Sequence, residues 1–590
     1  MNERGAQRAV VIILAAGLLV TAMITTNGSD HFRLPKELAF RAEAIALLAL
    51  GAFWLTSKRR TWRLEKRPEF FLAAAIVCWT LITVATSTNR QLSVDSLLTV
   101  LAAVMIFIVT CLAAQTTSFI AIDVLMIGAC VNAVIVILQE LKIWTPFLPA
   151  HDVNTHVGSV GLLGNPNDVG TYLAPAALTA IVMAMTAQGR RRAVYAAIGT
   201  LLVAGVAASA TRTAIAALVI GLIVFAIFHS RRVALVVAAI IIAVGLAALS
   251  PSTTLGRGAR QLAAAASQRD YQRLFSERLL PFLTAFEMAR DHPLTGVGPG
   301  CFKYHYMAYR VAMSGKYPAE WTRGYPMNWG EVHNDHLQVA AESGLPGYAL
   351  YLAAIALFAG WRRRGEPPTP EAGLARALRR PLAVLVLMIS IGQFPLELAA
   401  VRLMLLTLGA LCLTWDRDGE DRQECPSYTP RGGVAQTLLS VLFLIVATIA
   451  IYYLSIVPYR DNLVLGAVEY RSMLAESGKA PRTIAAAQRN LHDLDGAERS
   501  RRLDPNWYLL YGANCELIGR WRDAADVYTR ALRIDNRPEL YVSRGLALLH
   551  LGHTAEAEAD LAAAARFNPD VLHDLDGDLR ERVAAAAGLR

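Results

Sequence analysis

The sequence predicts an all-α fold, a polytopic bundle of membrane helices that carries a soluble α-helical repeat domain. The 590 residues are 55% hydrophobic and only 18% charged, whereas a soluble chain is about one quarter charged. The hydrophobic excess lies in long runs such as "AVVIILAAGLLVTAMITT", each close to the roughly 20 residues that a helix needs to cross a bilayer. The residues after 460 are polar instead and contain a repeated pattern.

About 12–13 hydrophobic runs qualify as spans. Backbone groups in lipid must bond within their own segment, so each run is expected to be a helix. The first run is not followed by a small-x-small cleavage site, and we interpret it as a retained span rather than a signal peptide. The runs lie near 9–26, 38–56, 70–88, 94–115, 117–139, 169–187, 191–209, 212–228, 232–249, 337–360, 381–397, 399–415 and 435–457.

Lys and Arg predict the orientation of the spans. If the spans alternate, five basic segments fall on one side of the membrane, and a positive bias marks the cytoplasmic side. The N-terminus is then cytoplasmic, and the long loop 250–336 and the C-terminal tail lie outside. Much of the net charge of +10 is this bias, so it does not indicate nucleic acid. The five segments are "MNERGAQR", "SKRRTWRLEKR", "QGRRR", "HSRR" and "WRRRGEPPTPEAGLARALRR".

Two domains follow from this pattern. Residues 1–459 form the membrane domain, in which the external loop 250–336 begins as an amphipathic helix and ends in a Gly-, Pro- and Tyr-rich stretch. Residues 460–590 form the external tail. Cys301 and Cys515 are both predicted outside the membrane, where a disulfide between them is one alternative to two free thiols.

The tail contains two similar segments, 507–537 and 540–570, with a period of about 33 residues. Their aromatic, small and Gly positions resemble the tetratricopeptide repeat, with Asn506-Trp507 and the turn at Gly519 fitting well. Residues 480–506 are a degenerate candidate for a preceding repeat. A short helical solenoid of this kind is either a docking surface for a protein partner or a structural cap on the membrane domain.

Nucleotide and metal motifs are incomplete. "ESGKA" lacks the upstream Gly and the following Ser or Thr of a phosphate loop, and "GVGPG" (296–300) has no preceding strand and suits a turn. His333 and His336 are three residues apart, whereas the zinc-protease pattern needs a spacing of four with an interposed Glu. We therefore predict neither a cofactor nor a metal site.

The stretch "EVHNDHLQVAAESGLPG" (331–347) places ionisable groups beside a predicted span, where such groups are costly. Asn334 or Asp335 is expected to cap the helix that follows. His333 has no role in a cap, and a His near neutral pKa at the membrane boundary suits a general base. Glu342 lies about 180° from His333 on an ideal helix, and we expect it to bind backbone or a neighbouring helix.

Two arginines lie on the same external side. Arg212 begins a span at its outer end. Its charge either complements the candidate base His333 or only reaches for the membrane interface. Arg278 opens the amphipathic helix of the insertion. It either complements His333 in the same way or belongs to the solvated face of that helix. Spacing alone links neither arginine to His333.

Four motifs in order resemble the O-antigen ligase and polymerase superfamily of bacterial envelope glycosyltransferases. They are "GNPNDVGTYLAPA" (164–176), "SATRTAIAAL" (209–218), "RLLPFLTAFEMARDHPLTGVGPGCF" (278–302) and "HNDHLQVAAESGLPG" (333–347). The resemblance covers roughly 160–360 by motif and 1–457 by hydropathy. Phe282 stands where the family usually has Trp, and a tetratricopeptide tail is absent from the simplest ligases.

The resemblance implies a membrane fold of the kind used by lipid-linked-sugar transferases, in the bacterial inner membrane. It implies that a glycan is moved, without a metal, from undecaprenyl diphosphate to an acceptor hydroxyl on the periplasmic face. His333 would then activate the acceptor, and Arg212 and Arg278 would bind the diphosphate. Asn165 and Asn167 match the family's Asn-Pro-Asn element, which either forms a turn or contacts lipid.

Three acceptors remain open. They are lipid A core, as in a ligase; a second lipid-linked repeat, as in a polymerase; and a protein hydroxyl. Two other functional classes compete with an enzyme. A transporter would use charges within spans, for which Arg41, Glu43 and Asp123 are candidates, but no paired broken helices are evident. A non-catalytic assembly protein would bind partners through its repeats.

Overall fold

The computed structural model describes residues 3–56, 67–117, 119–144, 159–229, 231–250, 252–313, 315–322, 328–360, 366–416, 434–501 and 503–589. Within these ranges every regular element is a helix, which confirms the all-α prediction. Most of the predicted basic loop 57–67, and residues 361–365 of the loop 361–380, lie outside the described residues.

Among the described residues, eight helices are long and apolar enough to cross a membrane, which makes this a multi-pass membrane protein. Each overlaps a predicted span, and the last, Val441–Glu476, extends well beyond the predicted 435–457. They are α3 (Pro68–Thr86), α4 (Arg90–Thr117), α5 (Ile120–Glu140), α6 (Pro166–Thr186), α7 (Gly189–Ala208), α8 (Arg212–His229), α15 (Asp335–Ala359) and the helix that continues α18 (Val434–Ile451).

Shorter apolar helices fall on three more of the predicted spans, at Arg8–Met23, Val237–Leu249 and Ala399–Trp415. They belong to α1 (Glu3–Met23), α9 (Arg231–Leu249) and α17 (Ala399–Trp415). The predicted span 38–56 lies within α2 (Arg33–Thr56).

The predicted span 381–397 is wrong in its boundaries. Its helix, α16, runs from Pro370 to Ile389, and residues 390–398 form a non-helical connection to α17. Gly392 and Pro395 explain the break, because Gly disfavours a helix interior and Pro both lacks an N–H and restricts the residue before it. We call this segment the 390–398 connection.

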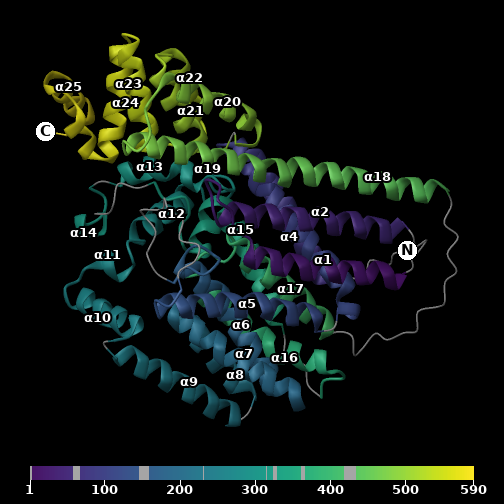
Figure 1. Cartoon of the computed structure of the whole chain (residues 1–590). Coiled ribbons are helices and arrows are strands. Elements are labelled where there is room, and N and C mark those ends of the chain that lie inside the picture. The colour runs from purple at the N-terminus through teal and green to yellow at the C-terminus, as the bar shows by residue number, and fades with distance from the viewer. Residues whose placement is uncertain are drawn as a thin grey trace.

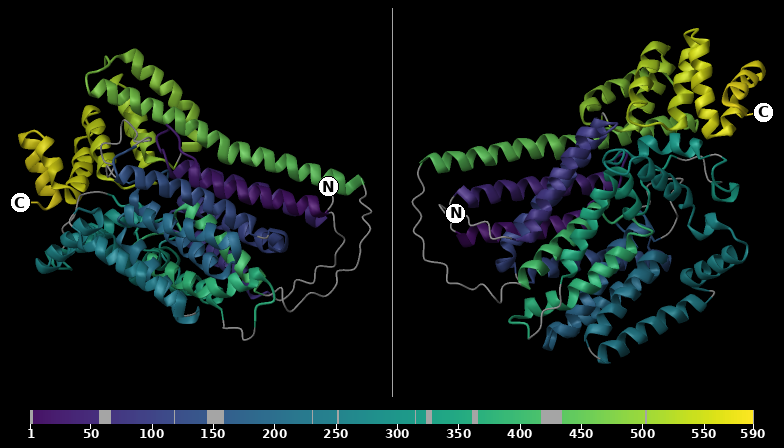
Figure 2. Two further views of the ribbon diagram at one scale, coloured as in Figure 1. Left: turned by 60° about the horizontal axis from the view of Figure 1, so that its bottom comes forward. Right: turned by 180° about the vertical axis from the view of Figure 1, so that it is seen from behind.

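The bundle is built around α6, which is buried along nearly its whole length. Its neighbours are α5, α7, α8 and α16, while α1, α2, α4 and α17 pack together beside it (Figure 1). Gly170 on α6 allows close packing, since a Cβ there would lie 2.6 Å from Thr211. The two views of Figure 2 show the helices running roughly along one direction.

The charges predicted within spans are mostly paired. Arg41 on α2 forms ion pairs with Asp95 (2.9 Å) and Glu37 (3.0 Å). Asp123 on α5 pairs with Arg191 at 3.2 Å. Glu43 is buried against Gly17 of α1. The ion pairs of Arg41 and of Asp123 are of the kind that stabilises a structure.

The segment between α9 and α15 folds over one end of the bundle. It contains α10 (Thr254–Ser267), α11 (Tyr271–Leu274), α12 (Leu279–Asp291), α13 (Phe302–Ala312) and α14 (Ala319–Thr322). The "GVGPG" stretch is a turn, as predicted: Gly296, Gly298 and Gly300 all have positive φ, and a Cβ on each would lie within 2.3 Å of a neighbouring segment.

A continuous helix joins the membrane bundle to the tail. α18 passes through a π-helical turn, Tyr452–Ile456, into α19 (Val457–Glu476). Pro458 accounts for the wider turn, because it cannot donate the usual helical hydrogen bond. The continuous helix formed by α18 and α19 lies beside α2 (Figure 1).

The tail consists of packed helix pairs. The two predicted repeats coincide with the pairs α21–α22 and α23–α24, which are preceded by α20 and followed by α25. Trp507 is buried and donates to the Leu494 carbonyl at 3.0 Å, and Gly519 makes the turn with φ 75°. The elements are α20 (Ile484–Arg501), α21 (Pro505–Leu517), α22 (Trp521–Ala531), α23 (Pro538–His550), α24 (Thr554–Phe567), the 3₁₀ helix Pro569–Asp574 and α25 (Gly577–Ala587).

The tail is docked on the membrane domain. Asn536 donates to the Tyr304 carbonyl (2.8 Å), and Asn89 donates to the Arg533 carbonyl (2.6 Å). One hydrophobic cluster also contains buried residues of both the insertion and the tail. Cys301 and Cys515 are both buried free thiols, so the alternative of a disulfide between them does not hold.

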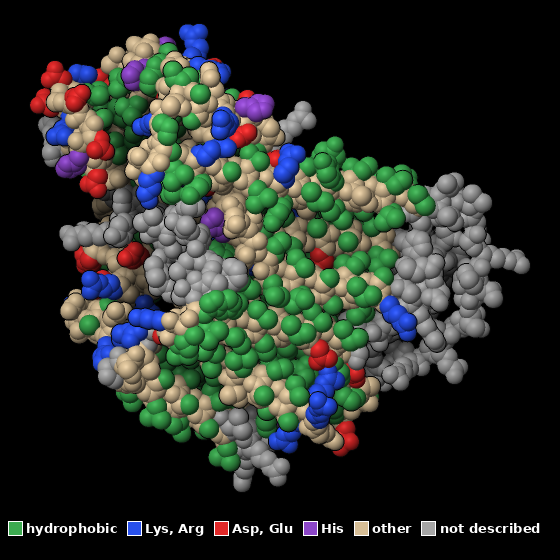
Figure 3. All heavy atoms as spheres, viewed as in Figure 1, with side chains coloured by type: hydrophobic (Ala, Val, Ile, Leu, Met, Phe, Trp, Pro, Cys, Tyr) green, Lys and Arg blue, Asp and Glu red, His purple; other side chains and the backbone are tan. Residues whose placement is uncertain are grey.

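Surface composition follows this architecture. Figure 3 shows hydrophobic side chains covering the side of the helical bundle, whereas charged side chains gather over the tail and towards the ends of the bundle. The start of α1 lies at the opposite end of the bundle from the tail (Figure 1). We call the end that carries the insertion and the tail the tail end.

Candidate active site

His333 lies at the tail end, in the turn before α15, where its backbone is left-handed (φ 57°). Its ring packs edge-on against Phe394 (centroids 4.4 Å apart) and Trp329 (5.3 Å). Nδ1 is buried and has no hydrogen-bond partner among the described residues. Aromatic rings therefore hold the imidazole, and its buried Nδ1 is left without a partner among the described residues.

The surroundings of His333 favour the neutral imidazole. Burial of the ring, together with the guanidinium charges of Arg278 and Arg33, holds the pKa of His333 well below its ordinary value of 6.5. Burial and both charges act in the same direction, since each penalises a further positive charge. At neutral pH the ring is unprotonated and can accept a proton.

Arg278 is the N-cap residue of α12, and its guanidinium donates to the Gly392 carbonyl. Burial lowers the pKa of Arg278 to about 10, with the charge of Asp168 opposing the shift and that of Arg212 adding to it. The side chain is still cationic at neutral pH. Among the described carboxylates, none lies within ion-pair distance of Arg278.

Arg212 lies next to Arg278. It is the first residue of α8, and its Nη2 donates to Ser276 Oγ at 3.0 Å, two residues before Arg278. The turn that presents it is fixed by Thr211 Oγ1, which donates to the Pro166 carbonyl at 2.8 Å. Two neighbouring guanidiniums repel each other, and an anion between them would relieve that repulsion.

The 390–398 connection touches every part of this site. Asn334 Nδ2 donates to the Ile391 carbonyl (2.9 Å), and Arg278 binds the carbonyl of the next residue. Gln393 Nε2 donates to Thr213 Oγ1 (3.0 Å), beside Arg212, and lies 3.4 Å from Asn167 Oδ1. Phe394 supports the imidazole. The connection thus holds segments together that are far apart in the sequence.

Arg33 is a third cation of the site, which the sequence did not single out. It begins α2, and its guanidinium lies 5.0 Å from the centroid of the Phe394 ring, on which His333 also packs. Ion pairs to Glu331 (3.0 Å) and Asp168 (3.5 Å) fix it. Asp168 is only 3% exposed and acts electrostatically on both Arg33 and Arg278, so it stabilises the cations as a group.

Left-handed backbone is concentrated at this site. The described non-glycine residues with positive φ are Lys142, Ala210, Arg269, Ser276, Glu277 and His333. Four of these six are His333 itself or lie within two residues of Arg212 or Arg278. Such a conformation costs roughly 1–2 kcal/mol for a residue with a Cβ, and it persists where surrounding contacts impose it, often at functional sites.

The remaining predicted residues have mainly structural partners. Asn334 caps α15, since its side chain accepts from Leu337 N (3.0 Å), and Asn165 caps α6, since its side chain accepts from Asn167 N (2.8 Å). Glu342 lies away from His333 and accepts from the backbone N–H groups of Gly300 (2.9 Å) and Phe302 (3.0 Å).

His336 lies apart from His333 in its contacts. Its Nε2 is 3.0 Å from the Leu387 carbonyl, and its Nδ1 is 3.2 Å from the hydroxyl of Tyr348. Among the described residues, no group of three or more His, Cys, Asp or Glu side chains is placed to hold a metal ion.

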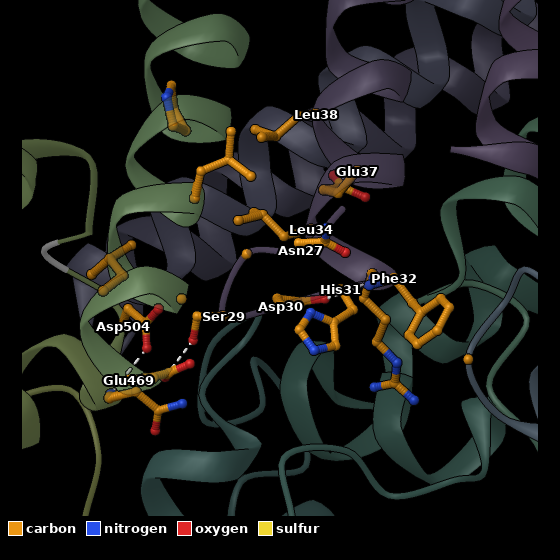
Figure 4. A pocket seen from close by; sticks show the side chains of 18 of the residues that line it. Asn27, Ser29, Asp30, His31, Phe32, Leu34, Glu37, Leu38, Glu469 and Asp504 are labelled. Carbon is orange, nitrogen blue, oxygen red and sulfur yellow. Dashed lines mark hydrogen bonds between the residues drawn. The ribbon is translucent and has the colours of Figure 1, made fainter. Parts of the chain in front are cut away.

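A cavity of about 1560 Å³ adjoins the site, and we call it the vestibule. Loop 27–34 and the start of α2 line one side, and α19 and residues 503–506 line the other. Figure 4 shows Asp30, His31 and Phe32 of the loop facing the space opposite Glu469 and Asp504. Arg33 and Asp168 line it as well, so it adjoins the site at Arg33.

A second cavity, of about 770 Å³, extends between α2, α3, α4, α15 and α17. It shares Arg33, Glu37 and Asp168 with the vestibule, and further along it is lined by apolar side chains that include Val104, Phe107, Leu350 and Ile355. At Arg33 and Asp168 the site therefore borders both a polar space and an apolar one within the bundle.

Residues 196–352 match the model of the O-antigen ligase family. The matched segment runs from α7 into α15 and contains Arg212, Arg278 and His333. The match supports the O-antigen ligase superfamily and a ligase or polymerase role of the glycosyltransferase type. No curated protein matches the chain.

Proposed function

We propose that this protein transfers a glycan from undecaprenyl diphosphate to an acceptor hydroxyl at the periplasmic face of the bacterial inner membrane. The observation that carries the proposal is the cationic pair Arg212 and Arg278 beside a neutral His333, in the segment that matches the O-antigen ligase family. A diphosphate is the anion that such a pair suits, because guanidinium groups bind phosphate oxygens in a bidentate manner.

His333 is the general base in this reaction. A ring nitrogen takes the proton of the acceptor hydroxyl as its oxygen forms a bond to the anomeric carbon. The bond between that carbon and the phosphate oxygen breaks, and undecaprenyl diphosphate leaves with the bonding electron pair. The imidazolium then returns its proton to the solvent or to the departing phosphate. No metal takes part in the proposed reaction.

Arg212 and Arg278 stabilise the charge that builds on the leaving diphosphate. Each charge-assisted hydrogen bond contributes about 1.5–3 kcal/mol, and preorganised charge of this kind is usually the largest catalytic term. Arg33 supplies further positive potential beside His333. The apolar second cavity, which Arg33 lines, suits the polyprenyl chain of the donor.

We propose lipid A core as the acceptor, because the matched family is described as O-antigen ligase. A strain that lacks the gene separates this acceptor from another lipid-linked repeat. On lipopolysaccharide electrophoresis, loss of a ligase leaves bare core while polymer stays on its lipid, and loss of a polymerase leaves core with a single repeat. A normal ladder with an unglycosylated protein would identify a protein acceptor instead.

Variants test the roles of the residues in the same strain. His333→Ala is expected to abolish transfer, and Arg278→Lys and Arg212→Lys to reduce it at least tenfold, because a point charge cannot replace the guanidinium fork. Arg273→Lys is the matched control, since Arg273 is 76% exposed and pairs with Asp270, three residues away. Near-normal transfer by the His333 variant would refute the base assignment.

The proposed orientation places the N-terminus in the cytoplasm, and the loop 250–336 and the tail in the periplasm. Residues 460–590 then form a periplasmic helical domain of the tetratricopeptide type, which both caps the membrane domain and offers a surface to a protein partner. A reporter fused after Arg590 that is active only in the periplasm tests the orientation. Activity of a cytoplasm-specific reporter at that position would reverse it.

A further inference from the structure

We propose that the vestibule binds several sugar units of a glycan, and that α19 and the start of the tail provide one of its walls. The inference rests on the proposed function and adds to it a second binding region beside the reacting groups. It concerns residues of α19 and the tail, which lie outside the matched segment 196–352.

The wall formed by α19 is fixed against the loop between α1 and α2. Asn462 is fully buried, and its side chain accepts from Asp30 N (2.9 Å) and donates to the Asp30 carbonyl (2.8 Å). Ser29 Oγ donates to Glu469 Oε1 at 2.6 Å. A Cβ on Gly466 would lie 2.5 Å from the backbone of Gly28, so the helix and the loop are in direct contact.

The lining of the vestibule suits sugars. Carboxylates accept hydrogen bonds from hydroxyl groups, and aromatic rings pack on the C–H faces of pyranose rings. The carboxylates are Asp30, Glu37, Asp95, Asp168, Glu469 and Asp504, and the rings are those of His31, Phe32, Tyr453 and Tyr470.

The vestibule is also large enough and close enough for a chain of sugars. Its volume of about 1560 Å³ exceeds the ~300–1,000 Å³ of a pocket for one small molecule. Arg33 lines it and stacks on Phe394, which contacts His333. A glycan whose reacting end is at His333 therefore has room to continue towards α19.

The experiment measures glycan binding to the purified full chain, in the absence of transfer. Two probes distinguish the source of the sugar: the glycan released by mild acid from the host's lipid-linked donor, and the host's delipidated lipopolysaccharide core. We expect at least one of them to bind to the wild-type chain and equally well to the inactive His333→Ala variant. The probe that binds shows whether the vestibule holds donor or acceptor sugar.

The double variant Glu469→Gln with Tyr470→Ala is expected to bind that probe at least tenfold more weakly. Its matched control is Glu476→Gln with Tyr452→Ala, which changes an exposed Glu of the same helix and an exposed Tyr that does not line the vestibule. The control is expected to bind as the wild-type chain does. If the double variant does not fold, Tyr470→Ala alone serves, because this Tyr is 42% exposed.

Two results would overturn the inference: binding of neither probe to the wild-type chain, or equal binding by the wild-type chain and the vestibule variant. Failure of the proposed function gives a different result. Transfer by the His333 variant would remove the assigned base, while the binding measurements with both probes would still stand on their own.

Discussion

Replacement of Arg33 tests whether the cations control the protonation of His333. Arg33→Gln removes one of the two charges that hold the pKa of His333 below its ordinary value. That pKa should therefore rise towards 6.5. Transfer needs the neutral imidazole, which disappears as the pH falls through the pKa, so the acid limb of the rate profile should move to higher pH. Arg33→Lys keeps a positive charge and should leave the limb near its original position.

The size of the rate effect follows from the contacts that are lost. Arg33 binds Glu331 at 3.0 Å and Asp168 at 3.5 Å. A hydrogen bond to a charged group is worth about 1.5–3 kcal/mol, and we reduce this to about 1–2 kcal/mol because the Arg33 side chain is 40% exposed and water screens it. One or two kcal/mol corresponds to roughly five- to thirtyfold. Both Arg33 variants should lose about this much activity above pH 7.

The assay is the pH dependence of kcat/KM with lipid-linked donor and the purified chain, between pH 4.5 and 8. Arg471→Gln is the control, since Arg471 has similar exposure (36%) and pairs with Asp493 within the tail region. An Arg33→Gln profile that coincides with the wild-type profile, in both height and acid limb, would refute the electrostatic coupling of Arg33 and His333.

Three further predictions concern the fold around the site. His333→Asn should lower transfer by at least ~10² with the melting temperature unchanged, because Asn tolerates left-handed backbone; a large loss of stability would show that the ring is mainly structural. Gly344→Ala should cost about 2–4 kcal/mol in urea unfolding, since Gly344 has φ 68° and its Cβ would lie 2.1 Å from the Leu294 carbonyl oxygen. Gly478→Ala is the comparison, since Gly478 has φ 71° but an added Cβ there would meet no atom within 4 Å; it should cost only about 1 kcal/mol. Equal losses of stability in the two variants would contradict the steric argument. Glu287 has its pKa lowered below 4.5, because hydrogen bonds from Lys316 and Tyr317 and the charge of Arg290 outweigh the opposing effect of burial; its contribution is present above pH 4.5 and lost as the pH falls through the lowered pKa. Glu287→Gln should therefore destabilise the chain by about 1–2 kcal/mol at pH 7 and by less near pH 3, as measured by thermal unfolding.

The sequence was sufficient for most of the helices, because runs of apolar residues are a strong signal of membrane spans. It also predicted a cap at Asn334 or Asp335, of which Asn334 is the observed cap, and the turn at residues 296–300, since their residue types favour those local structures. For Asn165 a turn and a lipid contact were both open, and the residue caps α6. Arg278 was predicted to open a helix, and it does so as the N-cap of α12.

The sequence pattern concealed the 390–398 connection, which was assigned to a span. Hydropathy averages over a window, and "ISIGQFPLEL" is apolar enough to extend the preceding run. Gly392 and Pro395 were the available signal. With the connection hidden, nothing linked Gln393 and Phe394 to the motifs that they hold together.

Arg33 and the left-handed residues were beyond sequence reasoning for different reasons. Arg33 lies in a predicted external loop among other polar residues, and only its packing on Phe394 distinguishes it. Ala210, Ser276 and Glu277 have no preference for positive φ. Their conformation is imposed by tertiary contacts, which no local pattern encodes.

The unbroken helix from the bundle into the tail has a geometric consequence. Val441–Glu476 spans 36 residues, or roughly 54 Å at 1.5 Å per residue, whereas the hydrocarbon layer is about 30 Å thick. The helix is therefore longer than the layer is thick, and part of it extends beyond the hydrocarbon. In the proposed orientation that part carries the α19 wall of the vestibule, so we expect a glycan bound there to lie close to the membrane surface.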